Sequence, residues 1–131
     1  MILETTFLID LERELRRGVE GPAHRFLESH AKTPLFITFT IAGELAAGLP
    51  PGDRNLWMEL IRPFRMLDCT PEVCWEYGQA YRYLKANGLL IGANDLWIGA
   101  TALAHGQPVV TRNVREFGRI PGLRVEAYAE G

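Results

Sequence analysis

Several polar side chains stand where apolar runs of the sequence end or where small-residue helices begin. Glu4 follows MIL, Glu44 comes one helical turn after LFITFT, and Asp95 opens the stretch DLWIGATALAH. Asn113 and Glu116 follow the run PVVT. Carboxylates that gather repel one another unless a cation neutralises them, and oxygen ligands without histidine or cysteine suit Mg²⁺ or Mn²⁺. Such a centre activates water for attack at phosphorus, so these residues suggest phosphate-ester chemistry.

Each of these residues also has a purely structural interpretation. An acid such as Asp95 at a helix N-terminus interacts favourably with the helix dipole, by about 0.3–1 kcal/mol. Glu44 fits the solvated side of a short helix, and Glu116 could form an ion pair with Arg112 one turn earlier. Glu4 resists this interpretation, because an unpaired carboxylate at the end of a half-buried strand is costly.

The acids need a scaffold that brings them together, and the sequence predicts one. Short apolar runs alternate with amphipathic helices, which is typical of an α/β fold with a mainly parallel sheet. In an open parallel sheet, ligands bind beyond the carboxyl ends of the strands, where the acids fall. The predicted strands cover 1–3, 35–40, 65–69, 108–111 and 123–128, and residues 88–93 fit either a strand or a buried loop.

Capping residues mark the starts of the predicted helices. Thr5 or Thr6 can cap a first helix over 7–17, which Gly18 ends. The predicted inner face of this helix consists of Phe7, Leu8, Leu11 and Leu15. Further helices are predicted over 22–30, 41–48, 54–62, 71–86 and 95–105. Asp53, Thr70 and Asn94 are the predicted N-caps of the last three. Gly48, with Pro50 and Pro51, is predicted to end the helix at 41–48.

Small residues surround two of the acids. Ala42, Gly43, Ala46 and Ala47 lie beside Glu44, and Gly99, Ala100 and Ala102 follow Asp95. Because small side chains let a helix approach a sheet closely, we expect both acids to be carried inward.

Composition limits the possible classes of protein. A chain of 131 residues with 47% hydrophobic and 23% charged residues is sufficient for one globular domain. A net charge of −2 argues against a polycation. The spacing of Cys69 and Cys74 is a poor zinc signal, and both are predicted to be buried free thiols. No apolar run is long enough to span a membrane and no signal peptide is recognisable, so a cytoplasmic location is expected.

Three stretches of the sequence resemble known motifs in order and spacing. ILETTFLIDL resembles the opening of PIN-domain proteins, and TIAGELAAG resembles their second acidic motif. GANDLWIGATALAHGQPVVTRNVREFGRIPGLRV closely resembles the third and fourth motifs of VapC toxins, the endoribonuclease halves of VapBC toxin–antitoxin pairs. The resemblance extends over essentially the whole chain.

The resemblance implies a PIN-like, three-layer α/β/α fold with a central five-stranded parallel sheet, formed by residues 1–131 as a single domain. It implies an acidic Mg²⁺ or Mn²⁺ pocket that hydrolyses RNA phosphodiester bonds. The first three family acids fall on Glu4, Glu44 and Asp95, the expected metal ligands, and the fourth position is divided between Asn113 and Glu116. A homodimer, inhibited by a VapB-type antitoxin that also binds operator DNA, is implied as well.

Two positions depart from the family pattern. The first acid is usually Asp and is Glu4 here, so an extra methylene moves the carboxylate outward. The fourth is usually Asp and is Asn113 here, and Glu116 could compensate for the lost charge. These departures leave open a rival interpretation, in which a catalytically weak or inactive PIN domain binds RNA or antitoxin within a DNA-binding repressor complex.

Hydroxyl and guanidinium groups near these motifs suggest substrate contacts. Arg112 and Arg115 flank the fourth motif and are predicted to bind RNA phosphates, although a solvated or antitoxin-facing role fits them equally well. Thr5, Thr6 and Thr111 are predicted to orient water or phosphate, and a structural role suits them too. Phosphoaspartyl transferases and receiver domains also carry acids at strand ends, but a transferase needs Asp-x-Asp where this chain has Glu4, Thr5 and Thr6.

Overall fold

The computed structural model describes residues 1–48 and 53–129, and its strands form one parallel sheet. The strands are β1 (Ile2–Leu3), β2 (Phe36–Thr38), β3 (Arg65–Leu67), β4 (Val109–Val110) and β5 (Val125–Glu126), in the order β3-β2-β1-β4-β5. The helices in the described part of the chain are α1 (Thr5–Arg17), α2 (Pro22–Ser29), α3 (Phe39–Gly48), α4 (Arg54–Ile61), α5 (Pro71–Ala86), α6 (Ala93–His105) and α7 (Val114–Phe117).

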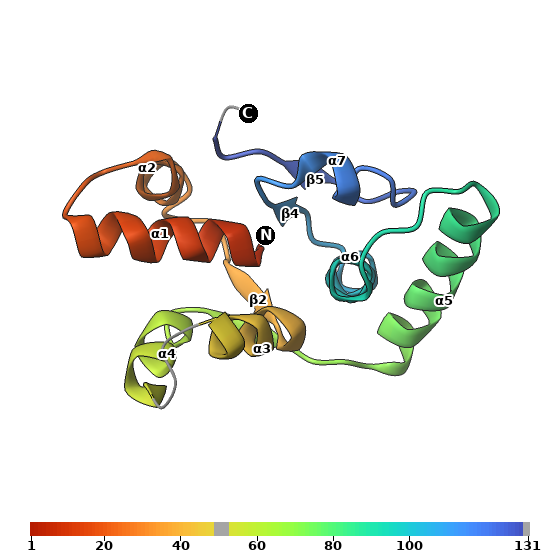
Figure 1. Ribbon diagram of the computed structural model, residues 1–131, viewed down its shortest axis with the longest axis horizontal. Coiled ribbons are helices and arrows are strands. Elements are labelled where there is room, and N and C mark those ends of the chain that lie inside the picture. Colours follow the sequence, from red (N-terminus) through yellow and green to blue (C-terminus); the bar gives the residue numbers. More distant parts are fainter. Residues whose placement is uncertain (49–52, 130–131) are drawn as a thin grey trace.

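Helices cover both faces of the sheet, so the predicted three-layer α/β/α fold with five parallel strands is confirmed. In Figure 1, α1 and α2 lie to one side of the strands, and α5 and α6 lie to the other. Strand β1 is central, and Ile2 pairs with Phe36 of β2 and with Val109 of β4. Ile2 and Leu3 are fully buried, as expected for a strand covered on both faces.

The strands are shorter than the apolar runs that predicted them. The run at 35–40 contributes only Phe36–Thr38 to β2, because Phe39 already begins α3. The hydroxyl of Thr38 accepts a hydrogen bond from the backbone N–H of Ile41 at 3.2 Å, which turns the chain directly from strand into helix. Residues 88–93 form no strand, and Leu89 and Ile91 pack against the core from a loop.

Helix α1 follows the predicted inner face over its first two turns. Phe7, Leu8 and Leu11 are buried, whereas Leu15 is 64% exposed, so its predicted burial is wrong. The buried residue of the last turns is Glu14, whose carboxylate accepts the backbone N–H groups of Ala23 (3.0 Å) and His24 (2.9 Å) at the start of α2. Glu14 thereby stabilises the N-terminus of α2, which has no cap from its own side chains.

The predicted close approach of the small-residue helices is confirmed for α6 and is wrong for most of α3. Gly99, Ala100 and Ala102 are buried, and a Cβ at Gly99 would lie 2.4 Å from Cδ1 of Ile120. In α3 only Ala42 of the small residues is buried, while Gly43, Ala46 and Ala47 are exposed. Helix α3 therefore places most of its small residues toward solvent.

Some of the predicted helix caps are confirmed, and one is wrong. Asp53 and Thr70 cap α4 and α5 as predicted, and Gly18 ends α1 in the left-handed conformation. Asn94 lies inside α6 and does not cap it, because the helix begins at Ala93. Pro50 and Pro51 lie outside the described residues.

The predicted burial of the two thiols is wrong, because Cys69 and Cys74 are exposed. Helix α5 buries Val73, Ala80 and Leu84, and Cys74 lies about 100° around the helix from Val73. None of the described helices is both long enough and apolar enough to cross a lipid bilayer.

Candidate active site

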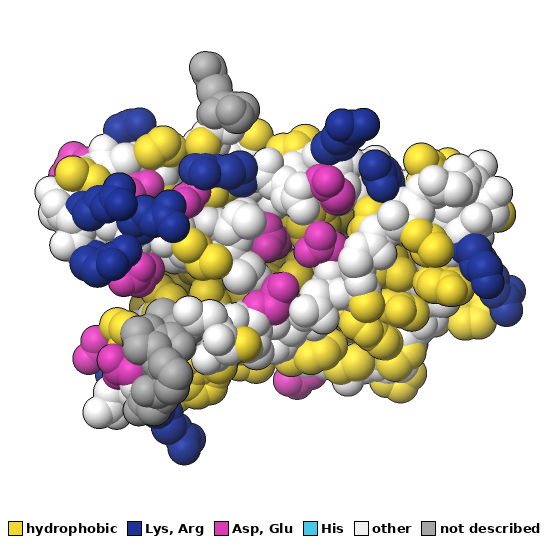
Figure 2. Space-filling model, in the orientation of Figure 1, with side chains coloured by type: hydrophobic (Ala, Val, Ile, Leu, Met, Phe, Trp, Pro, Cys, Tyr) yellow, Lys and Arg dark blue, Asp and Glu magenta, His cyan; other side chains and the backbone are white. Residues whose placement is uncertain are grey.

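The carboxyl ends of β1, β2 and β4 point to one edge of the sheet, and the predicted site residues follow them. Glu4 comes directly after β1, Glu44 lies in α3 after β2, and Asn113 and Glu116 follow β4 around the start of α7. Asp95 reaches the same edge from the first turn of α6. Figure 2 shows acidic side chains gathered around a hollow in the middle of this face.

Glu4 is the most enclosed of these acids, with 4% of its surface exposed. Its Oε1 accepts hydrogen bonds from the hydroxyls of Thr6 (2.8 Å) and Thr111, and its Oε2 accepts the backbone N–H of Thr6 at 3.2 Å. Glu4 is therefore the N-cap of α1, a role that the sequence suggested for Thr5 or Thr6. Each of these groups donates to the carboxylate, so together they hold it in one orientation.

Glu44 is held from two elements that are distant in the sequence. The hydroxyl of Thr5 donates to its Oε1 at 2.6 Å, and the amide of Asn94 donates to its Oε2 at 3.4 Å. The sequence suggested Asn94 only as a cap, and its contact with Glu44 could not be recognised because the two residues are 50 positions apart.

Asp95 carries the electrostatic signature of a crowded acidic centre. Burial, followed by the charges of Glu4, Glu44 and Glu116, raises the pKa of Asp95 from 3.8 to about 6. Its Oδ2 lies 3.5 Å from the side-chain nitrogen of Asn113, a contact at the limit of a hydrogen bond. The four acids are therefore close enough for their charges to interact.

The fourth-motif residues take different partners from those suggested by simple spacing. Arg112 forms its ion pair with Asp10 of α1, and not with Glu116. The backbone N–H of Asn113 donates to the hydroxyl of Thr111 at 2.9 Å, which connects the start of α7 to the Glu4 network. Arg115 is exposed on α7.

The predicted substrate-binding hydroxyls both point at carboxylates. Thr5 donates to Glu44 and Thr111 donates to Glu4. The hydroxyl of Thr6 also contacts Glu4, lies 3.4 Å from that of Thr111, and accepts the backbone N–H of Arg112 at 3.1 Å. These three threonines orient the carboxylates, and their position at the strand edge is the only sign of this in the sequence.

The spacing of the acids bears on which metal they can hold. In the described residues, three side chains offer ligand atoms within 4.8 Å of one another only at Glu20, His24 and Glu28. That surface group is an ion-paired turn in which Nε2 of His24 lies 2.8 Å from Glu28. At the strand edge the carboxylates are more widely spaced. An all-oxygen set of this kind fits Mg²⁺, which keeps several water ligands and takes few carboxylates directly.

Comparisons with known proteins agree with this architecture. Residues 1–123 match the PIN domain family. The chain is 43% identical over 131 residues to Ribonuclease VapC1 of Haemophilus influenzae strain R2866, covering 98% of each protein. It is 38% identical over 78 residues to the tRNA(fMet)-specific endonuclease VapC of Salmonella typhimurium strain LT2, covering 58% of this chain and 59% of that protein.

Solved structures show the same relationship. A chain in the crystal structure of VapBC2 from Rickettsia felis, bound to a DNA fragment from their promoter, has a TM-score of 0.82 to this chain. The identity is 25%, and the match covers 98% of both chains. With the strand order, the acidic edge and these matches taken together, the chain belongs to the PIN-domain family and, within it, to the VapC proteins.

Proposed function

We propose that this chain is a VapC-type endoribonuclease that hydrolyses RNA phosphodiester bonds with Mg²⁺ or Mn²⁺. The observation that carries the proposal is the position of Asp95 among Glu4, Glu44 and Glu116, where burial and then their charges raise its pKa. These carboxylates repel one another. A divalent cation bound among them would relieve that repulsion, and the attraction of their charges would hold the cation in place. The names of the VapC relatives as a ribonuclease and a tRNA endonuclease support RNA as the substrate.

Glu44 and Asp95 are the residues best placed to hold the ion, together with Glu4 through bridging water. When bound, the metal supplies Lewis acidity at a phosphate oxygen and lowers the pKa of a water molecule. Thr5 and Asn94 orient Glu44, Asn113 contacts Asp95, and Glu4 is fixed by its threonine donors.

Glu116 and Asn113 are proposed to orient the attacking water. In the reaction, the water loses a proton as its oxygen forms a bond to phosphorus, the bond from phosphorus to the leaving ribose oxygen breaks, and that oxygen gains a proton, so the proton count balances. Arg112 and Arg115 flank the centre from the side of α7 and are proposed to neutralise substrate phosphates.

The test is cleavage of labelled structured RNA, including tRNA, by purified protein with Mn²⁺, with Mg²⁺, and with EDTA. We expect cleavage with either metal, none with EDTA, and recovery when Mn²⁺ is restored. The Asp95→Asn variant should lose at least about a hundredfold in rate, because it removes a ligand charge while keeping the shape. Cleavage that persists in this variant would show that the proposed active site is wrong.

One observation favours the second candidate, a PIN domain that binds without cutting. Three donors already occupy the carboxylate of Glu4, which leaves it fewer lone pairs for a cation. Binding of RNA by the wild-type protein, with no cleavage in Mn²⁺, would select this candidate.

The proposal extends to partners. We propose that a VapB-type antitoxin inhibits the enzyme, links it to operator DNA and docks in a groove of about 500 Å³ between α1 and α4. This α1–α4 groove is lined by Leu11, Leu15, Leu56, Leu60, Pro63 and Phe64, with Glu12, Arg16 and Glu59 beside them. Its apolar floor and charged rim suit one face of an amphipathic helix.

A homodimer is also proposed, and exposed Trp75, Tyr81 and Tyr83 on α5 are candidates for its interface. Residues 1–131 are proposed to act as a single domain. We place the protein in the cytoplasm, where its proposed RNA substrate is found.

A further inference from the structure

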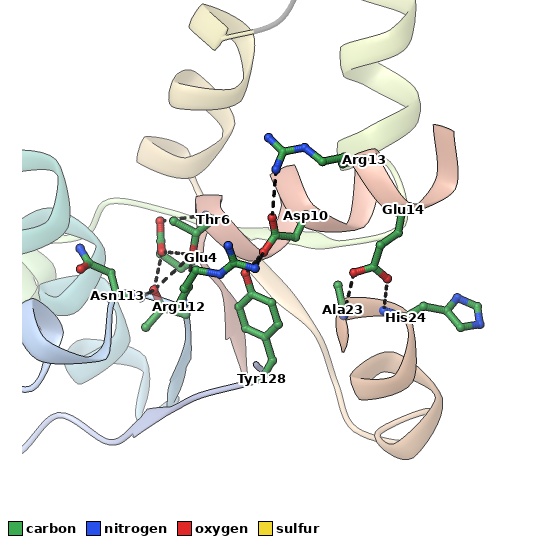
Figure 3. Close-up of polar contacts among 11 residues, drawn as sticks. Glu4, Thr6, Asp10, Arg13, Glu14, Ala23, His24, Arg112, Asn113 and Tyr128 are labelled. Atoms are coloured by element: carbon green, nitrogen blue, oxygen red, sulfur yellow. Dashed lines mark hydrogen bonds and ion pairs between the residues drawn. The ribbon is translucent and has the colours of Figure 1, made fainter. Parts of the chain in front are cut away.

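An ion-paired arginine lies beside the acidic centre. Asp10 of α1 accepts hydrogen bonds from the guanidinium of Arg112 and from the hydroxyl of Tyr128, as Figure 3 shows. The guanidinium of Arg112 lies 5.9 Å from the centre of the Tyr128 ring, and the side chain of Asp10 is only 12% exposed. Burial and the bond to Asp10 raise the pKa of Tyr128, so its hydroxyl remains a neutral donor. This network fixes the position of Arg112.

Arg112 also connects the acidic centre to a separate pocket. Its backbone N–H donates to Thr6, whose hydroxyl donates to Glu4. Its side chain lines a pocket of about 800 Å³ together with Pro22, Arg25, Phe26, Ser29, Ala127, Tyr128 and Ala129. We call this the arginine pocket. Arg112 therefore contacts the network around Glu4 through its backbone and also lines this pocket.

The charge of the arginine pocket suits an anion. Two arginines and no acid line it. Arg25 donates to the backbone carbonyl of Glu20 at 2.6 Å, and within the described residues no carboxylate forms an ion pair with it. Part of the Arg112 guanidinium pairs with Asp10, and its remaining N–H groups are available to a second anion.

The aromatic wall of the pocket suits a base. Phe26 and Tyr128 both line it, and both pack edge-on against the buried ring of Phe7, at 5.7 Å and 4.7 Å between ring centres. Single-stranded RNA is bound by combining cationic groups for the backbone with aromatic side chains for the bases. Rings that are fixed by packing offer such a surface at little entropic cost.

We propose that the arginine pocket binds a nucleotide of the RNA next to the scissile phosphate, with Arg25 and Arg112 on its phosphate and Asp10 as the positioning residue for Arg112. This inference rests on the proposed function, because it assigns a subsite to the same substrate. It commits to single-stranded RNA as the occupant, and a protein segment of the antitoxin is the alternative that the experiment must separate.

The first experiment measures RNA binding without cleavage. Fluorescein-labelled single-stranded RNA is titrated into protein carrying Asp95→Asn, in EDTA, at several salt concentrations. We expect Arg25→Ala and Arg112→Ala each to raise Kd about fivefold or more and to reduce the slope of log K against log salt by about 0.7. Arg82→Ala on the exposed side of α5 is the matched control and should change neither quantity.

The second experiment tests Asp10 through its coupling to Arg112. Asp10→Asn should raise Kd and KM with a smaller effect on kcat, and it should add nothing in a protein that already carries Arg112→Ala. A lower Kd for Asp10→Asn would overturn the positioning role, because it would show that Asp10 merely repels the RNA.

The outcomes separate this inference from the proposed function. If the wild-type protein cleaves RNA while Arg25→Ala and Arg112→Ala behave like Arg82→Ala, the subsite is wrong and the ribonuclease stands. If those two variants weaken antitoxin binding but not RNA binding, the pocket belongs to the protein partner and the inference falls. If the wild-type protein fails to cleave RNA in Mn²⁺, the proposed function falls, and the binding titration still decides whether RNA occupies the pocket.

Discussion

Thr5 and Glu44 are 39 residues apart in the sequence, and the hydroxyl of Thr5 donates to Oε1 of Glu44 at 2.6 Å. Thr5 begins α1 directly after the first acid, so the element that carries Glu4 also orients the second acid. Because Thr5 is buried, this bond is shielded from competing water. The two acids therefore form one unit, in which a change at the start of α1 affects both.

Removing this hydroxyl should disturb Glu44 without removing its charge. We expect Thr5→Val to lower the cleavage rate on the order of tenfold and to raise the Mn²⁺ concentration needed for half-maximal rate, because groups that orient metal ligands contribute at this scale. Thr5→Ser keeps the hydroxyl and should stay near the wild type. A valine variant with unchanged Mn²⁺ dependence would show that the bond has no role in positioning Glu44.

The donors around Glu4 make its charge important for stability as well as for catalysis. In Glu4→Gln, the amide NH₂ would face the hydroxyl and N–H donors of Thr6 and Thr111, so we expect unfolding in urea to become easier by about 1–3 kcal/mol. RNA cleavage should be lost as well. Glu4→Asp keeps the charge and is the control, with a cleavage rate closer to that of the wild type. Equal stability of the Gln variant and the wild type would contradict this account.

The raised pKa of Asp95 predicts a pH dependence of stability in metal-free buffer. The folded pKa is about 6 and the ordinary value is 3.8, so folding favours the protonated form. The stability that Asp95 provides when protonated is lost as pH rises from about 4 through about 6. Burial, and then the charges of Glu4, Glu44 and Glu116, are the causes.

Thermal unfolding in EDTA checks this sign. Asp95→Asn should match the wild type near pH 4, exceed its Tm increasingly as the pH rises through about 6, and keep a nearly constant excess above about pH 7, because Asn mimics the neutral acid. Mn²⁺ should raise the Tm of the wild type at the higher pH and have little effect on the variant. A variant that is less stable than the wild type at pH 7.5 in EDTA would refute the interpretation.

Two glycines in neighbouring helices should respond in opposite ways to the same substitution. A Cβ at Gly99 in α6 would lie 2.4 Å from Cδ1 of Ile120 and 3.5 Å from Leu123, so Gly99→Ala should destabilise the fold by about 1–3 kcal/mol. Gly43 in α3 has nothing within 4 Å of a built Cβ, so Gly43→Ala should stabilise it by about 0.5–1 kcal/mol. Urea midpoints at equal m-values measure both changes, and shifts of the same sign would be inconsistent with this packing.

The exposed leucine of the α1–α4 groove should matter for the antitoxin and not for RNA. Leu15→Glu places a charge on the apolar floor, so we expect the affinity for the co-expressed antitoxin to fall at least about tenfold. RNA cleavage by the free toxin should be unchanged. Val19→Glu is the control, since Val19 is exposed but does not line the groove. Equal loss in both variants would indicate a general effect of charge.

Much of the fold was predictable because it depends on local patterns. Apolar runs located all five strands, and the caps Asp53 and Thr70 located two helix starts. The placement of acids after strands also indicated which side chains would meet, because parallel strands end at a common edge.

What the sequence could not show depends on distant contacts. Thr111 meets Glu4 across 107 positions and Tyr128 meets Asp10 across 118, and no local pattern indicates either pair. The predicted burial of Leu15 is wrong for a related reason. Periodicity identifies the face of a helix that turns inward, but it does not show where the neighbouring element ends.

Glu4 as a helix cap shows tertiary structure overriding local preference. Threonine is favoured at the N-cap and glutamate is not, so Thr5 and Thr6 were the natural candidates. The backbone N–H of Glu4 instead bonds to the carbonyl of Val110 in β4, and the carboxylate turns back onto Thr6. The strand pairing decides where the helix begins.

The two ends of α1 give this helix a mechanical role. Thr5 and Thr6 in its first turn hold the carboxylates of Glu44 and Glu4, and Glu14 near its other end grips the first turn of α2. A helix of 13 residues is a stiff rod of about 20 Å, so a tilt that displaces one end also displaces the other. A protein that presses on the outer surface of α1 could therefore misalign the hydrolytic groups without ever entering the cavity that holds them.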